Sequence, residues 1–141
     1  MDEIAVKLEN VNAIRDEVQI LKEINIDFYH QKTTVVIGPS GCGKSTILKI
    51  AAGIVPPEKG EVYIDGQNVL RIPDRELVKL RKSHGFVFQD AALWANKTVA
   101  QNLSLPLQFH FQHLSPEEIS RRVTKTLSEA GYQDEEDLKP D

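Results

Sequence analysis

The octapeptide from residue 38 to residue 45 constrains this chain more than any other feature. It reads Gly38-Pro-Ser-Gly-Cys-Gly-Lys-Ser45, it follows the β-branched run Thr33–Ile37, and it precedes a segment whose apolar residues share one helical face. A short, continuous apolar run is typical of a strand that is covered on both faces of a parallel sheet. A strand, a glycine-rich loop and a helix in this order predict a phosphate-binding loop (P-loop) in an α/β protein.

Each residue type of this loop has a physical role in phosphate binding. The glycines allow backbone N–H groups to turn inward, and the helix that begins near Gly43 directs its positive end to the same place. We expect Lys44 to hold the β- and γ-phosphates, Ser45 to hold Mg²⁺, and Thr46 to lie near the α-phosphate. A turn that merely joins a strand to a helix is disfavoured, because all eight residues are in register with the expected flanks. The predicted nucleotide-binding residues are Gly38, Pro39, Ser40, Gly41, Cys42, Gly43, Lys44, Ser45 and Thr46.

The pattern of the chain changes from mixed α/β to helical near residue 95. Strands are predicted at Ile4–Val11, Ile24–Phe28, Thr33–Ile37, Glu61–Ile64 and Gly85–Gln89, and a helix at Asp74–Lys82. Ser115-Pro-Glu-Glu118 is a capping box, so a second helix is expected to begin there and to end at Gly131. The expected parts are therefore a core with a β subdomain at 1–95 and the beginning of a helical subdomain at 96–141.

Composition excludes several classes of protein. The 17 Lys and Arg residues are outnumbered by 21 Asp and Glu residues, a net charge of −4, which gives no support to a broad nucleic-acid-binding surface. A single cysteine, Cys42, excludes an intrachain disulfide. The start of the chain is charged and lacks the apolar core of a signal peptide, and no apolar stretch is long enough to cross a bilayer. Any role at a membrane is therefore expected to depend on a partner.

The motifs around the P-loop resemble one family. The loop followed by Gly53 and by Pro57-x-x-Gly60-Glu-Val-Tyr-Ile-Asp-Gly66 resembles the ATP-binding subunit of an ABC transporter, and Gly85-Phe-Val-Phe-Gln89 resembles the Q-loop strand of that family. The resemblance covers essentially the whole chain. It implies an α/β fold, the P-loop NTPase of the ABC ATPase type, with a mixed sheet, an antiparallel β subdomain and the start of a helical subdomain. Asp90–Asn102 with Pro106-Leu107 most resembles the lipid-asymmetry-maintenance branch of bacterial importers.

The resemblance also implies cofactors and partners. Mg²⁺ and ATP are the expected cofactors, with Lys44 and Gln89 in catalytic roles and Ser45 and Gln89 at the metal. The alternative for Gln89 is a strand-end side chain that faces solvent. A transmembrane permease subunit is expected to dock near Gln89–Pro106 and a second ATPase subunit to form a dimer, which would place the chain at the cytoplasmic face of a membrane. Trp94 would either anchor that contact or pack under the loop.

Two departures from the family pattern change these expectations. Many members stack an aromatic ring on adenine from the loop after the first strand. This chain has Ile14-Arg15 at about that position, so Arg15 would either stack on the base or be solvated. The family's signature segment, Walker B strand and switch histidine are absent, so the chain is expected to be incomplete at its C-terminus and to bind ATP without hydrolysing it alone. Without the Walker B strand, Thr33–Ile37 is expected to expose apolar side chains at an open edge.

Other functions stay open at this point. A non-transport ABC protein could use ATP to switch an assembly, and a naturally truncated nucleotide-binding regulator could compete with full-length subunits. His110-x-x-His113 could be a pair of metal ligands, but no third ligand has convincing spacing, and a solvated helical face is the simpler interpretation. His30 and His84 lie at the ends of predicted elements and are not expected to have a specific role.

Overall fold

The computed structural model describes residues 3–89, 92–132 and 137–140. The chain forms two units, Met1–Phe86 and Val87–Asp141, and each is described here by itself. The predicted division at residue 95 stays a prediction. No helix of the described residues is long and apolar enough to span a bilayer.

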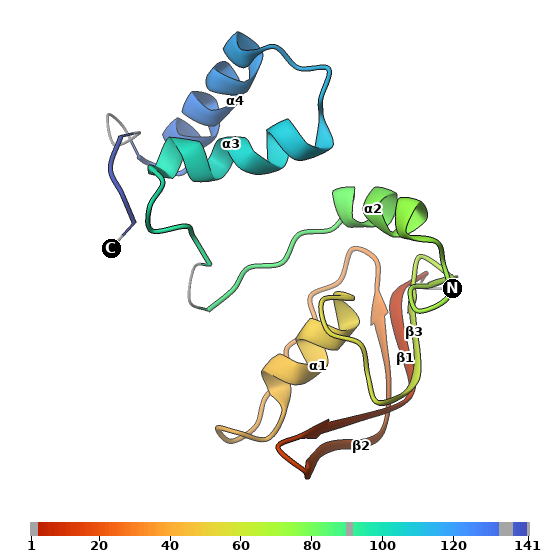
Figure 1. The fold of residues 1–141 in the computed structure, drawn as a ribbon. Helices are drawn as coiled ribbons and strands as arrows, with labels where there is room; N and C mark the ends of the chain where they lie inside the picture. The colour runs from red at the N-terminus through yellow and green to blue at the C-terminus, as the bar shows by residue number, and fades with distance from the viewer. Residues whose placement is uncertain (1–2, 90–91, 133–136, 141) are drawn as a thin grey trace. The chain divides into compact units, whose positions relative to one another are not determined.

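The first unit is built on an antiparallel sheet (Figure 1). Its strands are β1 (Ile4–Arg15), β2 (Val18–Tyr29), β3 (Lys59–Ile64) and β4 (Gln67–Asn68), in the order β2-β1-β3-β4. The sheet confirms the predicted antiparallel β part. β1 and β2 are longer than predicted because Asp16 and Glu17 both have positive φ, 51° and 66°, the geometry of a two-residue turn that lets both strands continue.

Two helices accompany this sheet. α1 (Lys44–Ala51) packs Ile47, Ile50 and Ala51 into the core, where Ile50 is fully buried beside residues of β1 and β3. α2 (Asp74–Lys82) has the predicted bounds, and Leu80 is its buried residue. The core therefore fixes the start of α1, and with it the end of the P-loop, against the sheet.

Two predicted strands are wrong. Thr33–Ile37 and Gly85–Gln89 are irregular, and neither joins the sheet of the described residues. Ile37 is 88% exposed and Val87 is 95% exposed, so the β-branched side chains that predicted buried strands lie in solvent. The reason is that a strand needs a neighbour to accept and donate its ladder hydrogen bonds, and the described residues provide no such neighbour. The apolar side chains of Thr33–Ile37 are exposed as expected, but they do not lie at an open sheet edge, because the segment is not a strand.

The second unit contains two helices, α3 (Val99–His110) and α4 (Pro116–Glu129). The predicted capping box is present at α4, where Glu118 N donates to Ser115 Oγ at 3.2 Å and Ser115 N donates to Glu118 Oε2 at 3.1 Å. α3 has a second capping box, formed by Thr98 and Gln101. Val123 of α4 is buried, as its position on the predicted apolar face requires.

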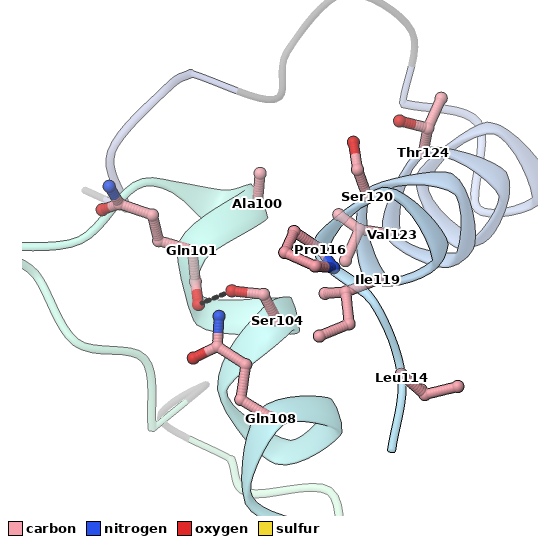
Figure 2. A pocket seen from close by; sticks show the side chains of 10 residues that line it. All are labelled: Ala100, Gln101, Ser104, Gln108, Leu114, Pro116, Ile119, Ser120, Val123 and Thr124. Carbon is pink, nitrogen blue, oxygen red and sulfur yellow. Dashed lines mark hydrogen bonds between the residues drawn. The ribbon is translucent and has the colours of Figure 1, made fainter. Parts of the chain in front are cut away.

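A hollow of about 390 Å³ lies between these two helices (Figure 2). Figure 2 shows that α3 lines it on one side and the start of α4 on the other. Its lining residues on α3 are Ala100, Gln101, Ser104 and Gln108. None of the predicted nucleotide-binding residues lines it.

A tight turn at Asp65-Gly66 joins β3 to β4, with positive φ at both residues. Beside it, the carboxylate of Glu61 accepts hydrogen bonds from Asn68 Nδ2 and from Arg71 Nη2. The hydrogen bond from Asn68, together with the charge of Arg71, lowers the pKa of Glu61 below its ordinary value of 4.5.

Candidate functional site

The P-loop is shaped by two glycines with positive φ. Gly41 has φ 80° and Gly43 has φ 94°, and Gly43 is the N-cap of α1. A Cβ atom at Gly43 would lie 2.8 Å from Leu21 Cδ2 and 2.9 Å from Ile20 Cγ2. A glycine is therefore required at position 43 for two reasons: the backbone there has positive φ, and β2 leaves no room for a side chain.

The start of α1 leaves backbone donors for an anion. The first hydrogen bond within the helix runs from Ile47 N to Gly43 O at 2.9 Å. The amides of Lys44, Ser45 and Thr46 precede it, so the helix itself provides them with no acceptor. Gly43 contributes no side-chain cap and the first turn contains no acidic residue, so nothing on this turn repels a negative charge.

Lys44 places its ammonium within the loop. Its Nζ donates to Gly38 O at 2.9 Å and to Pro39 O at 2.6 Å, so the loop curves around the cation. A Cβ atom at Gly38 would lie 2.8 Å from Cys42 Sγ, which shows how closely the two ends of the loop approach. The exposed backbone of residues 38–42, the cation and the helix N-terminus fit a phosphate group.

The metal expected at this site has one predicted ligand in the first unit, Ser45. Ser45 is exposed in the first turn of α1, where its hydroxyl could bind a cation shared with phosphate oxygens. The residues that the structure describes include no group of three or more His, Cys, Asp or Glu side chains suited to a metal ion. His110 and His113 belong to no such group of the described residues, and the interpretation of this pair as a solvated helical face stays a prediction.

A cavity of about 270 Å³ is lined in part by α1 and shares Thr46 with the P-loop. Its lining is mainly apolar, with three charged side chains: Ala13, Ile14, Arg15, Ile20, Thr46, Lys49, Ile50, Val55, Pro56 and Glu58. Arg15 is largely exposed, and its Nε lies 3.6 Å from Asp16 Oδ2. The lining has no aromatic side chain, as expected from the sequence at Ile14-Arg15.

Gln89 is exposed and belongs to the second unit, and its role at the metal stays a prediction. The next two residues lie outside the described part of the chain, but Leu93 and Trp94 are described. Trp94 is 62% exposed, so the alternative in which it packs under the loop is wrong. An exposed aromatic side chain here is available to a partner.

One structural residue of this region escaped prediction. Asn102 is 8% exposed and holds the turn that carries Trp94. Its Oδ1 accepts from Trp94 N at 2.8 Å, and its Nδ2 lies 3.1 Å from Trp94 O, 3.2 Å from Lys97 O and 3.0 Å from Thr98 O. The available signal was an asparagine in the first turns of a helix, a residue that favours hydrogen bonds to nearby backbone over helix interiors.

Comparisons with known proteins identify relatives of this chain. The family model described as ABC transporter matches residues 21–141. The chain is 35% identical over 130 residues to the intermembrane phospholipid transport system ATP-binding protein MlaF of Haemophilus influenzae, covering 92% of this chain and 48% of that protein. It is 40% identical over 139 residues to Protein TRIGALACTOSYLDIACYLGLYCEROL 3, chloroplastic, of Arabidopsis thaliana, covering 98% of this chain and 39% of that protein.

A solved structure is similar in fold as well as in sequence. It is a dimeric ATP-binding cassette in a post-hydrolysis state bound to ADP and Pi, with a TM-score of 0.85 and 36% identity over 96% of this chain and 61% of that chain. The fold is thus that of an ABC ATPase cassette with a P-loop. The chain belongs to the ABC transporter family of ATP-binding proteins. It spans 48% of the length of MlaF and 39% of the length of the Arabidopsis protein.

Proposed function

We propose that this chain is the nucleotide-binding part of an energy-coupling ATPase subunit that works on a membrane partner. The observation that carries the proposal is the P-loop itself, in which the amide donors at the start of α1 and the Lys44 ammonium converge on one exposed loop. Mg-ATP, when bound, would supply the phosphoryl group and the free energy of its hydrolysis.

The residues have distinct parts in this proposal. Lys44 would exchange its bonds to Gly38 O and Pro39 O for the β- and γ-phosphates, a change from carbonyl acceptors to charged ones. Ser45 would hold Mg²⁺ together with Gln89, whose amide oxygen adds no charge. The remaining residues of 38–46 would bind phosphate through backbone amides. The residues described offer no recognisable general base, so this chain alone would bind ATP without turning it over.

The base of the nucleotide would lie in the cavity that shares Thr46 with the P-loop. Its apolar lining suits a flat ring, and Arg15 at its edge could stack a guanidinium on that ring in place of an aromatic side chain. Stacking contacts the face of the ring, which every base has, so it discriminates little between bases. Adenine is therefore proposed as the base without strict selectivity.

The membrane partner would dock on the surface near Gln89–Pro106. Trp94 and Leu93 are exposed there, and Asn102 fixes the turn that presents them. A large aromatic side chain on a fixed turn is the kind of anchor that dominates interfaces. The dimeric state of the similar cassette supports a second ATPase subunit as a further partner. Such docking would place the chain at the cytoplasmic face of a membrane.

Lipid is the substrate class that we favour for the assembled transporter. The support is the similarity of this chain to the phospholipid transport protein MlaF over 92% of its length. A non-transport ABC protein and a nucleotide-binding regulator are the competing functions. Docking to a transmembrane subunit would favour transport over both.

Two assays separate these functions: co-purification of a membrane partner with the chain, and release of phosphate from ATP. Trp94→Ala should weaken recovery of a transmembrane subunit with the chain, whereas Tyr132→Ala, which removes another exposed aromatic ring, should not. The chain alone should release no more phosphate than its Lys44→Ala variant. Recovery of no membrane protein would exclude the transport proposal, and phosphate release that depends on Lys44 would exclude the binding-only proposal.

A further inference from the structure

A shared carboxylate joins two histidines that the sequence placed at unrelated element ends. His30 follows β2, Asp65 lies in the turn after β3, and His84 follows α2. His30 Nε2 lies 3.0 Å from Asp65 Oδ1, and His84 Nε2 lies 3.7 Å from Asp65 Oδ2. All three residues belong to the first unit and are partly exposed.

The hydrogen bonds of His84 determine which nitrogen carries its proton. Its Nδ1 lies 2.8 Å from Leu80 O and 3.0 Å from Ser83 Oγ. A carbonyl oxygen can only accept, and the Ser83 hydroxyl itself donates to Leu80 O, so we assign the proton of the neutral ring to Nδ1. Nε2 then has a lone pair in the neutral ring and lies 3.7 Å from Asp65 Oδ2. Two acceptors facing each other repel, and a proton on Nε2 turns this repulsion into an ion pair.

His30 differs from His84 in this respect. Its Nε2 is at hydrogen-bond distance from a carboxylate oxygen, which can only accept, so Nε2 carries a proton whether the ring is neutral or charged. The bond between His30 and Asp65 is therefore present in both charge states. Only the contact between His84 and Asp65 changes from repulsion to attraction on protonation.

The two histidines of this cluster lie where two irregular segments begin. His30 is the residue from which the chain runs through 31–37 into the P-loop, and His84 is the residue from which it runs through 85–88 to Gln89. Both segments are irregular and expose apolar side chains. Asp65 is itself held by its amide, which donates to Ala5 O at 2.9 Å.

We propose that Asp65 is the fixed part of a proton-operated clamp. Protonation of His84 closes the clamp, because one carboxylate then bonds both imidazoles and ties the end of α2 to the end of β2. Deprotonation opens it on the His84 side and leaves His30 bound.

Other charged residues lie on the same elements as the cluster. Lys32 follows His30 and Lys82 precedes His84 along the chain, and both are cations that cannot accept a proton from Nε2 as a carboxylate does. On the adjacent β1, Lys7 and Glu9 pair with each other at 2.5 Å. Glu3 contacts the cluster through its backbone, where its carbonyl accepts from His30 N at 2.9 Å.

Hydrogen exchange of three backbone amides tests the clamp. The amides of His30, Asp65 and Ser83 are hydrogen-bonded at the three joined ends. After correction for the intrinsic rates and relative to the Ile47 amide of α1, we expect their exchange to be about two- to five-fold slower at pH 5.5 than at pH 7.5, the range for a partly exposed ion pair. Asp65→Asn should abolish this difference. Asparagine keeps an acceptor for His30 and tolerates the left-handed backbone of residue 65, φ 48°.

Two further variants keep the result unambiguous. His84→Gln should also abolish the pH difference, and it decides the question if Asp65→Asn does not fold. His113→Gln removes an imidazole of the second unit and should leave the difference unchanged. A wild-type chain with no pH difference, or a difference that persists in Asp65→Asn or His84→Gln, would overturn the proposal. None of these outcomes depends on nucleotide binding, so the proposed function can fail or stand separately.

Discussion

Replacing Asn102 by alanine should release the turn that carries Trp94. The side chain of Asn102 is buried, its Oδ1 accepts one bond, and its Nδ2 has two hydrogens for three nearby carbonyl oxygens. It therefore makes at most three good hydrogen bonds at once. At about 1 kcal/mol each, their loss costs ~3 kcal/mol. Alanine recovers roughly 0.5 kcal/mol through its helix propensity, which leaves a loss of about 2.5 kcal/mol from the free energy of unfolding of the second unit.

Trp94 reports directly on this change, because it is the single tryptophan of the chain. Asn102→Ala should lower the fluorescence anisotropy of Trp94 in the folded state and increase its quenching by acrylamide, and the denaturation midpoint of the second unit should fall. Ser104→Ala is the matched control on the same helix, since the Ser104 hydroxyl donates only to the backbone of α3, at Gln101 O. It should change the free energy of unfolding by less than about 0.5 kcal/mol. An unchanged anisotropy in Asn102→Ala, or an equal loss in Ser104→Ala, would refute the assignment of Asn102 as the residue that fixes the turn.

Three further predictions concern the loop, a helix cap and a carboxylate. Gly43→Ala should lower the free energy of unfolding by about 1–3 kcal/mol and weaken phosphate binding, because residue 43 has positive φ and lies against β2. In the control Gly85→Ala the new Cβ meets nothing within 4 Å, so the change should be nearly neutral when the two variants are compared by chemical denaturation. Ser115→Ala should cost about 1 kcal/mol through loss of the α4 cap, and Ser120→Ala, an exposed serine within the same helix, should cost less than 0.5 kcal/mol in the same assay. The lowered pKa of Glu61 means that the folded chain holds this proton less tightly than the unfolded chain, so the stabilisation is present above pH 4.5 and is lost as the pH falls through the lowered pKa. Glu61→Gln should therefore flatten the decline of the thermal midpoint between about pH 5 and pH 3, and an equally steep decline in the variant would contradict the assignment.

Local patterns predicted the parts of the fold that depend on neighbours in sequence. The bounds of α2 and the capping box of α4 follow from residues within one or two turns, and the structure confirms both. The P-loop was predictable for the same reason, because its glycines, lysine and helix start lie within nine residues. The backbone angles at Gly41 and Gly43 agree with the roles assigned to them.

Patterns that depend on distant partners were misleading or silent. Thr33–Ile37 has the composition of a buried strand, but composition cannot supply the neighbouring strand that would pair with it. The pairing of Asp65 with His30 and His84 connects residues far apart in the sequence, and no local spacing indicates it. The role of Asn102 is intermediate, since its contacts are local but its burial is not visible in the pattern.

Equilibrium binding of Mg-ATP to this chain, measured by calorimetry, tests the central claim most directly. The account predicts saturable binding that Lys44→Ala weakens by about ten- to a hundred-fold, the value of one or two charge-assisted hydrogen bonds. Lys125→Ala, which removes an exposed lysine of α4 and the same charge, should bind as the wild type does. Binding that is absent, or that Lys44→Ala and Lys125→Ala affect equally, would contradict the assignment of residues 38–46 as a nucleotide site.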